Sequence, residues 1–79
     1  MCKVLTQDKS RLMDVSNTDI YIEQKDKHIF NICVYRYTRS LVLGTYRTEE
    51  YTKIVLDLLG EYLGREKYFK MPEINYLPE

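Results

Sequence analysis

The fold is decided by residues 48–63, which read TEEYTKIVLDLLGEYL. The apolar side chains of this stretch recur at the three- and four-residue spacing of one helical face. They are Tyr51, Ile54, Val55, Leu58, Leu59 and Tyr62. Thr48 is a favourable N-cap residue, Glu49 and Glu50 stand in the first turn, and Gly64 predicts the C-terminal end. The stretch therefore predicts an amphipathic helix over residues 48–63, with the stripe buried and Leu58 at its centre.

The first 47 residues predict five short strands, because β-branched and aromatic runs alternate there with clusters of turn-forming residues. The expected strands, which together occupy residues 2–47, cover residues 2–7, 11–15, 20–24, 28–37 and 41–47. Links this short join antiparallel neighbours, since a parallel crossover needs about a dozen residues. The sequence thus predicts an α+β fold, an antiparallel meander of about five strands packed by one C-terminal helix. The alternative is a small β-barrel or roll capped by the same helix.

The two strands before the helix carry the clearest alternation. Residues 28–37 form the longest strand, and its expected inward side chains are Phe30, Ile32 and Val34. In the next strand Leu41 and Leu43 share a face, until Gly44 interrupts the pattern. Glycine inside a strand is typical of a β-bulge or of a close backbone approach. A bulge at Gly44 would change the inward positions from odd to even numbers and bring Tyr46 inward.

The segment after the helix predicts one more edge strand at residues 67–71, ended by Pro72, and then a loose tail at residues 73–79. A chain of 79 residues has room for one modest core, so we expect residues 1–79 to form a single domain. Lys and Arg number 12, and Asp and Glu also number 12. This balance disfavours both a globally basic nucleic-acid binder and an acidic mimic of nucleic acid.

Membrane and secretion signals are lacking in the sequence. The apolar runs are far shorter than the about 18 residues that a membrane-spanning helix needs. The first eight residues, MCKVLTQD, contain no apolar secretory region. We therefore expect a cytoplasmic protein that contacts no membrane.

Four stretches form a pattern that recurs in other chains. They are QDK at residues 7–9, LGTYRTEE at residues 43–50, IVL at residues 54–56 and YFKMPE at residues 68–73. On these stretches the chain resembles, over nearly its whole length, short uncharacterised proteins of Gram-positive bacteria and their phages. It departs from their pattern at Tyr51, where a small or charged residue is commoner, a change that concerns the packing of the first helical turn. No activity is established for such proteins, so the resemblance implies a bacterial or phage-related cytoplasmic protein and no catalytic residue or substrate.

Residues with catalytic or metal-binding chemistry are few. His28 stands at a strand start, and no serine, cysteine or carboxylate is placed by spacing to orient it. Cys2 and Cys33 have no metal-ligand spacing, and a single histidine cannot complete a Cys2His2 site. Glu49 and Glu50 point about 100° apart on a helix, which suits dipole stabilisation and not acid–base catalysis. The sequence therefore predicts reduced thiols and no catalytic, cofactor or metal site, and hence no enzyme.

One segment favours contact with nucleic acid. The candidate contact residues are Tyr35, Arg36, Tyr37, Arg39 and Arg47. Aromatic rings interleaved with arginines on a sheet can stack unpaired bases and neutralise phosphates. Strand alternation places Tyr35 and Tyr37 on one face and Arg36 on the other, so one platform would use part of the set. The competing interpretation is a solvated strand and turn without a ligand.

A second feature favours self-association. Leu56 and Leu63 lie off the centre of the helical stripe and form a second line, and a wide apolar arc left exposed usually marks an interface. The competing interpretation is that residues 67–71 fold back and cover both leucines. The sequence thus predicts a non-enzymatic small protein-interaction or structural module that forms a homodimer and has an unidentified protein partner. The alternative is a small single-stranded nucleic-acid-binding domain that uses the hairpin at residues 35–39.

Overall fold

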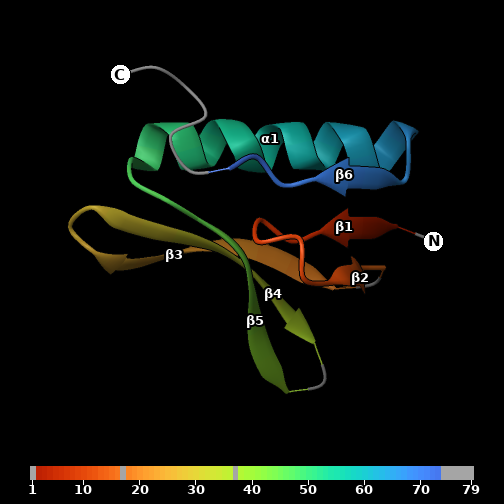
Figure 1. Ribbon diagram of the computed structural model, residues 1–79, viewed down its shortest axis with the longest axis horizontal. Helices are drawn as coiled ribbons and strands as arrows, with labels where there is room; N and C mark the ends of the chain where they lie inside the picture. The colour runs from red at the N-terminus through yellow and green to blue at the C-terminus, as the bar shows by residue number, and fades with distance from the viewer. Residues whose placement is uncertain (1, 17, 37, 74–79) are drawn as a thin grey trace.

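The computed structural model describes residues 2–16, 18–36 and 38–73 and contains six strands, arranged in two small sheets, and one helix (Figure 1). In chain order the elements are β1 (Lys3–Leu5), β2 (Leu12–Asp14), β3 (Asp19–Asp26), β4 (Ile29–Arg36), β5 (Arg39–Tyr46), α1 (Glu49–Arg65) and β6 (Tyr68–Lys70). The predicted α+β class is confirmed. Every predicted strand forms, with its ends displaced by a residue or two. The tail beyond Glu73 and the position of Tyr37 lie outside the described residues.

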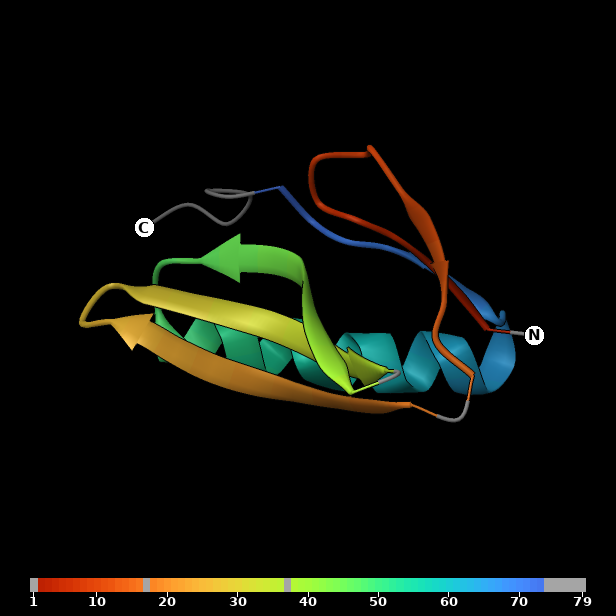
Figure 2. The same cartoon turned by 90° about the horizontal axis from the view of Figure 1, so that it is seen from below.

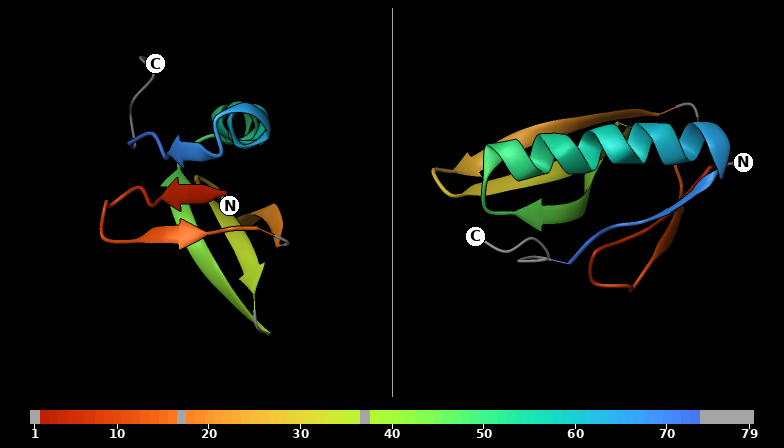
Figure 3. Two further views of the ribbon diagram at one scale, coloured as in Figure 1. Left: turned by 90° about the vertical axis from the view of Figure 1, so that its right-hand side faces the viewer. Right: turned by 90° about the horizontal axis from the view of Figure 1, so that it is seen from above.

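The strands divide into one sheet of order β2-β1-β6 and another of order β3-β4-β5. The antiparallel meander is thus confined to β3, β4 and β5, and these strands do not close into a barrel. The expected edge strand forms as β6, but it pairs parallel to β1, with Val4 opposite Phe69. Figure 3 shows β6, β1 and β2 in succession across their sheet, with α1 beside β6. The link between β2 and β3 is short, yet it carries the chain from one sheet to the other.

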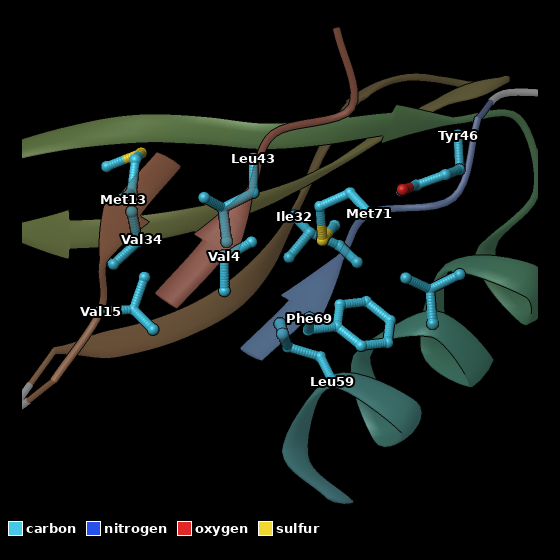
Figure 4. Packing of buried hydrophobic residues seen from close by; sticks show 11 residues of the cluster. Val4, Met13, Val15, Ile32, Val34, Leu43, Tyr46, Leu59, Phe69 and Met71 are labelled. Atoms are coloured by element: carbon cyan, nitrogen blue, oxygen red, sulfur yellow. The ribbon is translucent and has the colours of Figure 1, made fainter. Parts of the chain in front are cut away.

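One hydrophobic core lies between the two sheets and the helix. This shared core explains why the strands divide into two sheets. Its buried side chains are Val4, Met13, Val15, Ile32, Val34, Leu43, Tyr46, Val55, Leu59, Phe69 and Met71. Figure 4 shows these side chains directed into a common interior from β1, β2, β4, β5, α1 and β6. Two three-stranded layers and a helix enclose this interior, whereas one five-stranded sheet would leave most of one face in water.

The predicted bulge at Gly44 is confirmed. Ile32 lies opposite Gly44 and Cys33 lies opposite Val42, so Leu43 is the extra residue of β5. The shift brings Tyr46 to a fully buried position, as expected from the change of parity. A Cβ atom at position 44 would lie 2.7 Å from the Tyr46 hydroxyl oxygen. Glycine is therefore required here because the tyrosine ring passes over the backbone.

Gln7 fastens the β1–β2 turn to the bulged strand. Its backbone N–H donates to the carbonyl of Leu43 at 2.9 Å, and its side-chain Oε1 accepts from the Thr45 N–H at 3.0 Å. Its Nε2 donates to the carbonyl of Thr45 at 2.9 Å. The side chain thus pairs with β5 as a short strand would. This pairing ties the two sheets together.

The helix begins as predicted and ends later. Thr48 is the N-cap, and its Oγ1 accepts from the Tyr51 N–H at 3.2 Å. The predicted end at Gly64 is wrong, because α1 continues to Arg65 and the positive φ of 60° falls on Lys67. The N–H groups of Glu66 and Lys67 both donate to the carbonyl of Tyr62 and close this end.

The buried face of α1 is rotated from the predicted stripe. Its fully buried residues are Thr52, Val55 and Leu59, while Ile54, Leu58 and Tyr62 are exposed. Thr52 is accommodated inside because its hydroxyl donates to the Thr48 carbonyl at 2.5 Å. The helix runs along the β3–β4 part of the meander (Figure 2) and also contacts β6. The expectation that Leu58 lies at the centre of the core is therefore wrong.

The rotation also overturns the exposed position expected for Leu56 and Leu63. Both leucines are partly buried and pack against the core. The fold-back of β6 was the competing explanation for their burial, but the groove beside β6 is lined by Leu58 and Tyr62 instead. The apolar surface of the helix is consequently on the β6 side.

Candidate functional site

The side chains with catalytic or metal-binding chemistry are dispersed. Within residues 2–16, 18–36 and 38–73, no three histidine, cysteine or acidic side chains come together in a way that could hold a metal ion. His28 is exposed in the turn between β3 and β4. Glu49 forms an exposed ion pair with Lys53 at 3.5 Å, which matches a helix-stabilising role.

The two cysteines are free thiols in separate places. Cys33 is buried in β4, and burial, together with the negative charge of Glu23, raises the pKa of its thiol. A thiol in this setting stays protonated and is a poor nucleophile. The Cys2 sulfur lies 3.9 Å from the carbonyl oxygen of Leu63 and is partly buried.

Three arginines line a groove of about 340 Å³ between β2 and the β4–β5 hairpin. We call it the arginine groove, and the described residues that line it are Arg11, Leu12, Met13, Asp14, Arg36, Arg39 and Leu41. Arg36 Nη1 donates to the main-chain carbonyl of Asp14, so a β4 side chain is anchored on β2. The groove therefore brings together Arg11, which precedes β2, with Arg36 and Arg39 of the β4–β5 hairpin.

Of the described residues that line the arginine groove, Asp14 is the acidic one. Its Oδ1 accepts from the Ser16 N–H at 2.9 Å. This hydrogen bond is the main cause that lowers the pKa of the carboxyl group, and the charges of Lys3 and Arg36 lower it further. Asp14 is thus ionised at neutral pH and offsets part of the positive charge.

The structure assembles part of the predicted nucleic-acid contact set. Arg36 and Arg39 meet in the arginine groove, but Tyr35 does not line it and projects from the opposite face of β4. Arg47 follows the far end of β5 and lies outside the groove. Arg11, which does line it, was missed because the pairing of β1 with β2 sets its position and no local pattern marks it.

A second surface is apolar and lies on α1 and β6. Ile54, Leu58 and Tyr62 follow one another at four-residue intervals and are 47%, 40% and 40% exposed, and Tyr68 of β6 is 45% exposed. We call these four residues the helix–β6 surface. Leu58, Tyr62 and Tyr68 line a groove of about 470 Å³ together with residues 69–73.

Aromatic contacts order this surface. The Tyr62 ring meets the Phe69 ring edge-on, with their centroids 5.4 Å apart. The Arg65 guanidinium carbon lies 5.8 Å from the centroid of the Tyr62 ring, within cation–π range. The sequence periodicity singled out Ile54, Leu58 and Tyr62 but assigned all three to the core.

No helix within the described part of the chain is long and apolar enough to cross a membrane. Comparison of the chain with protein-family models, with curated proteins and with solved structures finds no match.

Proposed function

We propose that the protein is a non-enzymatic interaction module that binds a second copy of itself through the helix–β6 surface. The observation that carries this proposal is the exposure of Leu58, Tyr62 and Tyr68 along one groove, with Ile54 exposed one helical turn before Leu58. A contiguous exposed apolar patch is typical of a protein interface, and tyrosine is enriched there. A small domain also gains stability from association, since its own core is modest.

The backbone of β6 favours a second copy as the partner. The Lys67 carbonyl and the Met71 N–H both bond to β1, so strand alternation turns the N–H and C=O groups of Tyr68 and Lys70 away from β1. An edge strand of this kind can pair with its own copy about a two-fold axis. Antiparallel pairing centred on Phe69 would place Tyr68 opposite Lys70 of the partner subunit and would avoid facing lysines. It would join the two sheets across the interface.

The self-association surface differs from the one expected from the sequence. Leu56 and Leu63 pack against the core of their own chain, so the proposal places the contact on the β6 side of the helix. Two free thiols suit a reducing compartment, and we therefore place the module in the cytoplasm. The resemblance to short proteins of Gram-positive bacteria and their phages is in keeping with that setting.

The proposal is tested by the solution mass of the full chain across a hundredfold dilution. At high concentration we expect twice the chain mass of 9.5 kDa, and dissociation on dilution. Leu58→Lys should remain a folded monomer throughout, because a charge at the centre of the interface is left without water or a partner. Val42→Lys is the matched control, since Val42 is 49% exposed on β5, and it should dimerise like the unchanged chain.

Two results would overturn the proposal. One is a 9.5 kDa mass for the unchanged chain at high micromolar concentration. The other is equal dissociation of the Val42→Lys and Leu58→Lys variants, which would place the contact elsewhere. Leu56→Lys and Leu63→Lys are expected to destabilise the fold itself, because both side chains pack against the core.

A further inference from the structure

We infer that the arginine groove binds a phosphate group. Arg11 precedes β2, Arg36 ends β4 and Arg39 begins β5, so the groove forms only when the two sheets are assembled. A guanidinium presents several N–H donors in a planar fork, which matches the oxygens of a phosphate. Because three arginines line one concave site, a phosphate oxyanion is the ligand of best chemical fit.

The position of Arg36 shows that the groove is built before any ligand arrives. Its bond to the Asp14 carbonyl holds the side chain against β2, so its guanidinium does not have to be ordered on binding. Ordering a long side chain on binding costs conformational entropy, and a pre-positioned side chain avoids part of that cost. Arg11 and Arg39 are exposed and flank this fixed group.

The distribution of charge also favours an anionic ligand in the arginine groove. The whole chain has equal numbers of basic and acidic residues, yet the lining of the groove has three arginines and one aspartate. The Asp14 carboxylate accepts from the Ser16 N–H, and the Arg36 guanidinium donates to the main-chain carbonyl of Asp14. An excess of positive charge in a concave site attracts anions even when the net charge of the protein is zero.

The lining also indicates what part of a ligand is recognised. Among the residues that the structure describes, no aromatic side chain lines the groove, so none of them offers a ring for a base to stack on there. The volume of about 340 Å³ is near the lower end of the about 300–1,000 Å³ of small-ligand sites. Leu12 and Leu41 add apolar walls of limited area. The site thus suits a phosphate group itself, supplied by a free phosphorylated small molecule or by the backbone of a single-stranded nucleic acid.

This inference is independent of the proposed self-association, because the arginine groove and the helix–β6 surface share no residue. The experiment is an NMR titration of the nitrogen-15-labelled full chain with pyrophosphate, with a nucleoside monophosphate and with a short oligothymidylate. We expect the side-chain Nε–Hε signals of Arg11, Arg36 and Arg39 to shift with saturation. Sodium chloride at the same ionic strength is the reference for screening effects.

The test variants replace exposed arginines, and we therefore expect each variant to fold. Arg39→Ala and Arg11→Ala should each weaken pyrophosphate binding about tenfold, the value of one charge-assisted hydrogen-bonded pair. Arg39→Lys should lose less, because it keeps the charge but not the fork. Arg47→Ala, an exposed arginine outside the groove, is the matched control and should leave the affinity unchanged.

The relative affinities of the three anions identify the source of the phosphate. Tighter binding of oligothymidylate assigns the groove to a single strand, and tighter binding of pyrophosphate or the monophosphate assigns it to a free small molecule. Absence of saturable shifts with all three anions would overturn the inference. So would an Arg47→Ala variant that loses as much affinity as Arg39→Ala, since binding would then be a general surface effect.

Discussion

Replacing each of two adjacent leucines in α1 by alanine tests the orientation of the helix. Leu59 is 1% exposed and belongs to the core, whereas Leu58 is 40% exposed. Leu59→Ala should lower the free energy of unfolding by about 2–5 kcal/mol, because it removes buried carbon atoms and leaves a cavity. Leu58→Ala should cost about 1 kcal/mol, since a half-exposed side chain has only part of its apolar area to lose.

The loss of stability expected for Leu59→Ala is large for a chain of this length. At about 0.05–0.15 kcal/mol per residue, the total stability is about 4–12 kcal/mol, so Leu59→Ala removes a large fraction of it. Urea unfolding followed by circular dichroism gives both values from the midpoints at a common slope. The protein is held at a low concentration, where association through Leu58 does not contribute. Equal losses for the two variants, or a larger loss for Leu58→Ala, would refute the helix orientation described above.

Further predictions concern two glycines and two aspartates. Gly44→Ala should destabilise the fold by about 1–3 kcal/mol, because the added methyl group would lie 2.7 Å from the Tyr46 hydroxyl oxygen. Gly60→Ala should stabilise it by about 0.5–1 kcal/mol, since position 60 is helical and a Cβ atom there meets nothing within 4 Å; thermal unfolding of both variants checks the opposite signs. Hydrogen bonds lower the pKa values of the Asp8 and Asp14 carboxyl groups from their usual range in the folded state, so the unfolded chain takes up protons first as the pH falls. Stability should therefore be full at neutral pH and decline below about pH 5, and Asp14→Asn should make that decline shallower in urea unfolding across the acid range.

Local features of the fold were predictable from the sequence. The N-cap at Thr48 and the helix that follows depend on neighbouring residues alone. The bulge at Gly44 was predictable for the same reason, and with it the burial of Tyr46, because the period of two along a strand transmits one insertion to every later position.

Pairing between distant segments was not predictable in the same way. The parallel pairing of β1 with β6 brings together residues more than sixty positions apart, and no local pattern encodes it. The short link after β2 implied an antiparallel neighbour, but burial of both sheets against α1 outweighs that local preference. The left-handed residue that follows the helix is Lys67, whereas the sequence indicated Gly64 for that role.

The candidate surfaces were partly predictable. The apolar arc of α1 is so wide that periodicity could not tell which edge faces the core, and the burial of Thr52 turned Leu58 and Tyr62 outward. Arg36 and Arg39 were grouped correctly because one hairpin holds them together. Arg11 joins them only through the assembly of the two sheets.

Transfer of magnetisation between subunits tests the central claim most directly. A mixture of isotope-labelled and unlabelled chains shows, by isotope-filtered NMR, only contacts between copies. We predict intermolecular contacts from the Leu58 methyl groups and the Tyr62 ring to Tyr68 and Lys70 of the partner subunit. Intermolecular contacts confined to Leu12 or Val42, or none at concentrations where the mass is that of a dimer, would contradict self-association through the helix–β6 surface.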